Sequence, residues 1–143
     1  SESKKTESHP VFHEELVLVA PAGLLREDPS LKEILEAPLI EYFASHPAMA
    51  RWLQLHFRKK TKRLPVRVYA SAAEMVLALV AEGAGIGVVP KFLIDSTRLK
   101  RPVRIVRPSQ KKLLDHIWML ENKTPRTALH EEFKKHLLSE LGA

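Results

Sequence analysis

Short apolar runs alternate along this chain with segments whose apolar residues recur at helical spacing. The run at 16–20, LVLVA, ends before Pro21 and Gly23 and predicts a buried strand. Further strands are predicted at 39–43, 66–69, 86–89 and 102–106, with a last one around 116–120. Residues 1–13 are polar and charged, so this segment is expected to be a linker or loop.

Helices are predicted between these strands. One begins near Ser30 and ends before Pro38, and a stronger one begins at Pro47 and carries Trp52 and Leu53 on its apolar stripe. A third is expected to begin with Ser71 as its cap, because Glu74 three residues later completes a capping-box pattern. A single helical turn is predicted at 91–94 and an amphipathic helix at 127–141. This alternation of strands and helices indicates an α/β architecture with a mostly parallel central sheet.

The stretch 81–91, AEGAGIGVVPK, holds three of the five glycines in the chain. A dinucleotide loop requires a strand before its glycines and a helix after them, whereas here a helix precedes and a strand follows. The stretch is therefore not a nucleotide site. Gly83 is expected to end the helix in the left-handed conformation, and Gly85 and Gly87 to allow close backbone approach.

The composition is that of a globular domain: 143 residues, 45% hydrophobic and 28% charged, with no cysteine. No apolar run is long enough for a membrane span, and the cysteine count fits a cytoplasmic location. The net charge of +6 and the basic run at 58–63, RKKTKR, raise the possibility of direct DNA binding. The simpler interpretation is a solvated helix end, where cations are favoured.

The candidate chemistry is sparse. His130 and His136 lie too far apart for the HExxH zinc motif, in which the second histidine would stand at the position of Lys134. Neither Ser45 nor Ser71 is paired by the sequence with a base and an orienting acid. We therefore predict no catalytic residue, no metal site and no cofactor, and expect the protein not to be an enzyme. Ser71 at a helix start is still suited to bind an anion.

The segments PLIEY (38–42), VYASAAEMVLALVAEGAGIGVVPKFL (68–93) and TPRTALHEEFKKHLLSEL (124–141) resemble, in this order and spacing, the C-terminal effector-binding domain of LysR-type transcriptional regulators. LVAEGAGIGVVPK is similar to the family's pattern of a helix ending LVxxGxGIxxxP. HEELVLVAPAG resembles the strand that crosses into the second lobe, although Ala22 to Leu25 replace the family's His-Pro-Leu turn.

The resemblance implies a three-layer lobe of the type 2 periplasmic-binding-protein fold. It places a linker or loop from the first lobe at 1–14, the second lobe at 15–109, and a strand and helix that return to an incomplete first lobe at 110–143. The family's N-terminal winged helix-turn-helix, its linker helix and most of the first lobe have no counterpart here. The chain is therefore expected to be a fragment of a regulator.

By the same resemblance, a small and usually anionic effector binds between two lobes and is coupled to DNA that only the absent N-terminal domain contacts. The partners implied are this effector and further copies of the chain, as a dimer or tetramer, with the helix around Trp52 as a candidate contact. The alternative is a solute-binding domain without a DNA role. The residues carried over as ligand-binding are those at matching positions on the inner rim: Glu41, Tyr42, Phe43, Ser71, Ala72, Val89 and Pro90.

Overall fold

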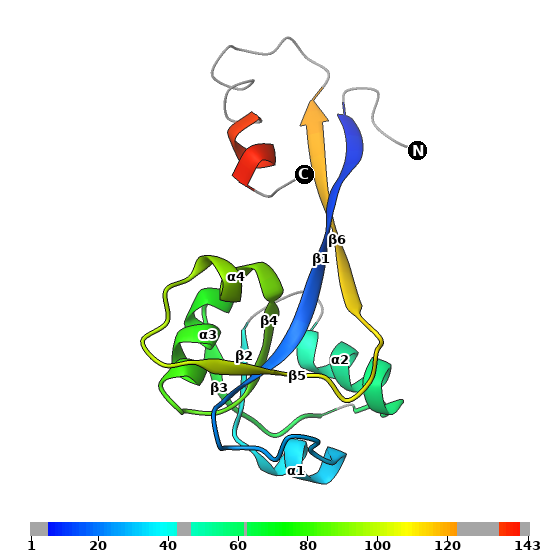
Figure 1. Ribbon diagram of the computed structural model, residues 1–143. Coiled ribbons are helices and arrows are strands. Elements are labelled where there is room, and N and C mark those ends of the chain that lie inside the picture. Colours follow the sequence, from blue (N-terminus) through cyan, green and yellow to red (C-terminus); the bar gives the residue numbers. More distant parts are fainter. Residues whose placement is uncertain (1–5, 43–46, 62, 123–134, 141–143) are drawn as a thin grey trace. The chain divides into compact units, whose positions relative to one another are not determined.

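The computed structural model describes residues 6–42, 47–61, 63–122 and 135–140. The chain forms two compact units, one of residues 15–113 and one of residues 1–14 together with 114–143. Figure 1 shows the elements. The strands are β1 (Thr6–Pro21), β2 (Leu39–Tyr42), β3 (Val66–Ala70), β4 (Gly87–Pro90), β5 (Val103–Val106) and β6 (Leu113–Asn122), and the helices are α1 (Leu31–Glu36), α2 (Ala48–Phe57), α3 (Ala73–Ala81) and α4 (Lys91–Ser96).

Most strands of the 15–113 unit run in one direction, as predicted, although they form two sheets linked by a bridge between β2 and the start of β4. β2 and β3 pair in parallel, with Glu41 opposite Tyr69 and Tyr42 opposite Ala70. β4 lies beside β2 in the same direction, since the Ile40 amide donates to the Ile86 carbonyl over 2.8 Å and the two strands meet in a parallel bridge. β1 is antiparallel to both β4 and β5, and also pairs with β6. Hence β2 to β5 run one way and β1 alone runs against them.

Helices cover both faces of these sheets. Leu16, Leu18 and Leu39 pack in one buried cluster with residues of α1 and α2, whereas their neighbours Val17, Val19 and Ile40 pack in a second cluster with residues of α3 and α4. Successive strand residues point to opposite faces, so the alternation builds three layers from a continuous apolar run. Burying each large apolar side chain contributes about 1.5–3 kcal/mol.

Trp52 and Leu53 are almost fully buried in the first cluster, at 1% and 0% exposure. Their burial agrees with ordinary packing of this helix against the sheet, so these two side chains are not available to contact another copy of the chain. They face the sheet because the apolar side of the amphipathic helix α2 packs against the core.

Two further segments differ from the prediction. β1 begins at Thr6, so most of the expected linker or loop at 1–14 is strand, which its pairing with β6 supplies with hydrogen-bond partners. The predicted helix at 127–141 is helical at 135–140, and the rest of it lies outside the described residues.

The glycines behave as the sequence indicates. Gly83 has φ +87°, in the left-handed region, and its amide donates to the Val80 carbonyl just beyond α3. A Cβ atom at Gly87 would lie 2.6 Å from Cγ1 of Val76 and 2.8 Å from the Ile40 carbonyl oxygen. Glycine at 87 therefore lets β4 approach both α3 and β2.

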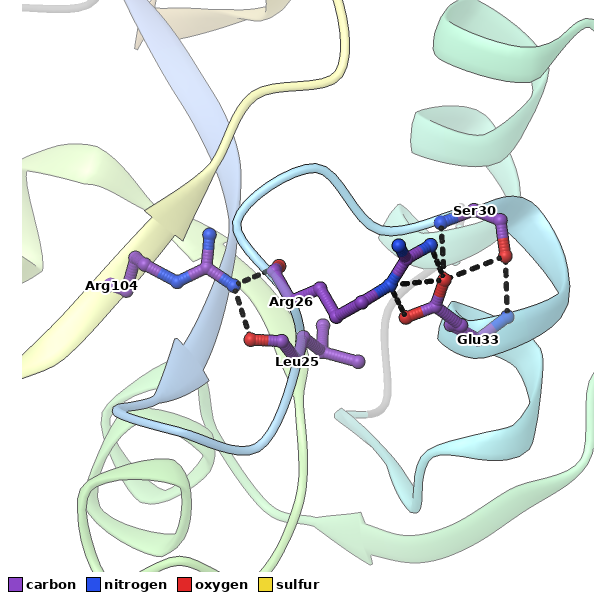
Figure 2. A network of polar contacts seen from close by, with 5 residues as sticks. All are labelled: Leu25, Arg26, Ser30, Glu33 and Arg104. Atoms are coloured by element: carbon purple, nitrogen blue, oxygen red, sulfur yellow. Dashed lines mark hydrogen bonds and ion pairs between the residues drawn. The ribbon is translucent and has the colours of Figure 1, made fainter.

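The start of α1 is closed by side chains, as Figure 2 shows. The Glu33 amide donates to Ser30 Oγ over 3.2 Å, and Glu33 reaches back to the Ser30 amide, which completes a capping box. Arg26 donates to both carboxylate oxygens of Glu33, and this bonding lowers the pKa of Glu33 to about 2. Arg104 of β5 holds the preceding loop by donating to the carbonyls of Leu25, Arg26 and Glu27.

Candidate functional site

Three parallel strands end at one edge of the sheet, and the predicted ligand-binding residues gather there. Tyr42 ends β2 next to Ala70, which ends β3, so Ser71 and Ala72 follow directly at the same edge. Pro90 ends β4, which runs parallel to β2. Each strand is then followed by a helix whose N-terminus lies at this edge (Figure 1). In open α/β sheets, ligands bind outside the carboxyl ends of the strands.

The N-terminus of α3 differs from the prediction. The helix begins at Ala73 and its N-cap is Ala72, with φ −155° and no capping side chain. Ser71 stands one residue too early, so the expected cap and its box with Glu74 are wrong. Met75 makes the first helical bond, to the Ala72 carbonyl, which leaves the amides of Ala73 and Glu74 ahead of it.

Ser71 itself is exposed, and its hydroxyl has no hydrogen-bond partner among the described residues. Within the described residues, a hydroxyl and two backbone amides close in sequence therefore follow β3 without side-chain partners. The positive end of the helix dipole adds to their preference for negative charge. This group of donors suits a carboxylate, a phosphate or a small inorganic anion.

Glu41 has a different role from its neighbours. It is 4% exposed, and its Oε2 accepts a hydrogen bond from the Met49 amide over 3.3 Å, in the first turn of α2. Pro47, the N-cap of α2, makes no side-chain bond, so the strand supplies what the cap does not. Burial raises the pKa of Glu41, with the hydrogen bond from Met49 acting in the other direction. Its Oε1 is buried without a hydrogen-bond partner in the described part of the chain.

The apolar members of the predicted set are less accessible. Val89 and Pro90 are buried, and Val89 packs between Ile40 and α3 in the second core cluster. Tyr42 is half-buried against the same cluster. Phe43 lies outside the described residues. At this edge, therefore, Val89 offers backbone rather than side chain.

The sequence predicts that backbone amides next to Ser71 bind an anion, but it does not identify them as those of Ala73 and Glu74. The S-x-x-E pattern at 71–74 indicates a helix start but does not fix its phase, and one residue decides whether the serine closes the helix or lies beside it. Nothing in the sequence indicates that Glu41 reaches the start of α2.

The described residues offer no metal site, and their grooves lie away from this edge. These residues include no cluster of three or more histidine or acidic side chains that could hold a metal ion. Two open grooves, of about 590 and 620 Å³, are lined by none of the predicted residues: one borders α2 and the other the 107–112 loop. Within the same residues, no helix has the length and apolarity needed to cross a membrane.

The fold is an α/β domain with helices on both faces of its sheets and the carboxyl ends of three parallel strands at one edge. The model of the LysR substrate binding domain matches residues 2–142, and the chain belongs to this family. No protein with a curated description matches the sequence.

Solved structures with the same fold include regulatory domains of transcription regulators. The regulatory domain of CrgA, a LysR-type transcriptional regulator from Neisseria meningitidis, has a TM-score of 0.68 and 17% identity, covering 99% of this chain and 71% of its own. The effector domain of AmpR from Pseudomonas aeruginosa has 0.66 and 16%, covering 96% and 66%. The CcmR regulatory domain of Synechocystis PCC6803, in complex with 2-PG, has 0.64 and 14%, covering 97% and 68%. The chain thus spans about two thirds of the length of these domains.

Proposed function

We propose that this chain senses a small anionic effector for a LysR-type transcriptional regulator. The observation that carries the proposal is the start of α3, where the amides of Ala73 and Glu74 and the hydroxyl of Ser71 face no capping side chain. The fold relative CcmR, crystallised with 2-PG, supports a small organic ligand. Family membership supports a regulatory role rather than a catalytic one.

In this proposal the residues at the strand ends have different roles. Ser71 and the amides after Ala72 hold the anionic group. Tyr42 and Phe43 shape the apolar side of the site, and the backbone of Val89 and Pro90 closes it. Glu41 stays buried, where it fixes the start of α2 and so the position of β2 relative to that helix.

Binding becomes a signal only when the effector prefers one arrangement of the regulator over another. We propose that this preference is coupled to DNA binding by an N-terminal winged helix-turn-helix. We also propose that the regulator is cytoplasmic and assembles as a homodimer or homotetramer. Coupling of this type amounts to about 1–3 kcal/mol. It is reciprocal, so operator DNA would change the affinity for the effector by the same factor, and in the same direction, as the effector changes the affinity for DNA.

The test is an NMR titration of the ¹⁵N-labelled chain with 2-PG, with malonate and with glycerol as an uncharged control. We expect saturable shifts of the Ala73 and Glu74 amides with at least one anion and none with glycerol. Ser71→Ala should weaken the binding, because one donor is lost. Saturable binding that leaves both amides unmoved, or equal binding of glycerol, would contradict the proposed site.

Thermal unfolding gives an independent readout across a wider panel of carboxylates and phosphate esters. A ligand at about 100 times its Kd should stabilise the folded protein by about 2.7 kcal/mol. The rise should follow the charge of the ligand and be clearly smaller in the Ser71→Ala variant at the same ligand concentration. An equal rise in both proteins would place the ligand elsewhere.

A further inference from the structure

Two basic segments that are far apart in the sequence lie against each other. The first follows the C-terminal end of α2 and includes Arg58 to Arg63, and the second is the connection from β5 to β6, residues 107–112. His56 Nδ1 of α2 and Ser109 Oγ of the connection are 2.7 Å apart in a hydrogen bond. In Figure 1 the C-terminal end of α2 lies beside this yellow connection. The groove of about 590 Å³ is bordered by both Lys60 and Leu113.

The hydrogen bond at Ser109 also orders the second segment. Ser109 Oγ accepts from the Lys111 amide over 3.3 Å, so the same hydroxyl ties the loop to itself and to α2. The second groove, of about 620 Å³, is lined by the loop itself, including Arg107, Gln110 and Lys112. Basic and amide side chains therefore border a hollow in this surface rather than a flat face.

Most cations of the two segments form no ion pair within the described residues. Neither 58–63 nor 107–112 contains an acidic residue, and Glu15 pairs with Arg107 over 2.8 Å. Six exposed cations form no ion pair among the described residues: Arg58, Lys59, Lys60, Arg63, Lys111 and Lys112. By contrast, basic side chains on α1 and α4 pair with carboxylates one turn away, as in Lys91 with Asp95.

The pKa of His56 reflects this excess of positive charge. This pKa is lowered first by burial and then by the charges of Lys111 and Arg107. The two residues whose charges lower the pKa of His56 belong to segment 107–112, while His56 lies in the last turn of α2, just before segment 58–63. The two segments therefore act on the same small volume.

We infer that segments 58–63 and 107–112 together form a surface that binds the phosphate backbone of duplex DNA. Lys, Arg, Ser and Gln side chains are those that contact phosphates, and such interfaces are more positive and more polar than interfaces between proteins. None of the exposed large hydrophobic side chains in the described residues lies in either segment, so an apolar anchor for a protein partner is missing there. This contact would be additional to the one expected from an N-terminal DNA-binding domain.

The test compares two triple variants by fluorescence anisotropy with a labelled 20-base-pair duplex. In the first, Lys60, Lys111 and Lys112 are each replaced by Gln. The matched control replaces Arg98, Lys100 and Arg101 by Gln, which removes the same charge from exposed positions before β5, at the opposite end of that strand from the 107–112 loop. Circular dichroism should show that both variants keep the fold, since none of these six side chains makes an ion pair or hydrogen bond within the described residues.

We expect the unaltered chain to bind duplexes of different sequence alike, with an affinity that falls steeply between about 50 and about 200 mM salt. The first variant should bind about tenfold or more weakly, and its salt slope should be smaller by about 3, roughly one per phosphate contact removed. The control should stay within about threefold of the unaltered chain.

Equal losses in the two variants would overturn the inference, because binding would then follow net charge rather than this surface. Binding of polyglutamate as tight as that of duplex DNA would also overturn it, and would indicate an acidic protein as the partner. Absence of duplex binding by the unaltered chain at about 50 mM salt would do the same. Since no residue of the effector site is altered, effector binding in the NMR titration should be the same in all three proteins.

Discussion

The chain contains the pattern S-x-x-E at two helix starts, and the two behave in opposite ways. At 30–33 the serine is the N-cap of α1, a capping box bonds the amides of Ser30 and Glu33, and Arg26 holds the Glu33 carboxylate. At 71–74 the helix begins one residue later, no side chain caps it, and the amides of Ala73 and Glu74 stay available. The first start is built for stability. The second has no capping side chain, and in the proposed function its donors bind a ligand; the two starts differ by one residue in where the helix begins.

The largest effect is expected from adding a capping side chain at the N-terminus of α3. Ala72→Asp places an acceptor at the N-cap of α3, where its carboxylate can accept from the Glu74 or Met75 amide. We expect the free energy of unfolding to rise by about 0.5–1 kcal/mol, while the affinity for an anionic effector falls tenfold or more. Urea unfolding and the NMR titration measure the two effects.

Ala72→Asn is the control for charge, because it caps the helix with a neutral side chain. It should give a similar gain in stability and a smaller loss of affinity. If neither variant weakened anion binding, the start of α3 would not be the binding site.

The converse experiment removes the capping side chain of α1. Ser30→Ala removes the acceptor for the Glu33 amide and should lower the free energy of unfolding by about 1 kcal/mol. Ser71→Ala deletes the same hydroxyl from an exposed site without a cap and should change it by less than about 0.5 kcal/mol. Parallel urea unfolding curves test the pair, and an equal loss in both would show that Ser71 supports α3 after all.

Glu41 at the start of α2 gives a third case, closed from a neighbouring strand. Because burial raises the pKa of Glu41, its protonated form favours the folded state. That contribution is complete below the ordinary pKa of 4.5 and is lost as the pH rises through the raised value. The stability of Glu41→Gln relative to the unaltered chain should therefore increase from about pH 4 to about pH 7. Thermal unfolding at each pH measures it, and a constant difference would contradict a buried carboxyl.

The smallest effect is expected at Arg26, on the exposed side of the α1 cap. The pKa of Glu33 is lowered to about 2 chiefly by the hydrogen bonds from Arg26. The stability that Glu33 provides is thus present above pH 4.5 and is lost as the pH falls towards 2. Arg26→Gln should raise the pKa of Glu33 towards its ordinary value, as followed by carboxyl ¹³C shifts. Lys32→Gln, which removes a cation 4.0 Å from Glu36, should leave it unchanged.

The sequence predicted the scaffold well because its signals are local. The alternation of apolar runs with helical spacing placed β1 to β5 and α1 to α4, and Gly83 marked the end of α3 because a left-handed residue is needed there. The alternating faces of 16–20 are also local, since neighbouring strand residues point to opposite layers.

The parts that sequence reasoning misplaced depend on contacts between distant residues or on a shift of one residue. Ser71 misses the N-cap because the turn after β3 delays α3 by one position. The bond from Met49 to Glu41 joins a helix to a strand across a connection whose path no local pattern fixes. The 58–63 run reads alone as a solvated helix end, and only the His56–Ser109 contact brings the second basic segment beside it.

Arg104 has a consequence for how the folded protein meets proteases. The loop before α1 is exposed and contains Arg26, a residue after which trypsin cuts. Cleavage needs that segment to be drawn out as an extended strand, yet its carbonyl is held by Arg104 and its guanidinium by Glu33 (Figure 2). Trypsin should therefore cut after Arg26 far more slowly than after the exposed Lys100, and Arg104→Gln should speed cleavage after Arg26.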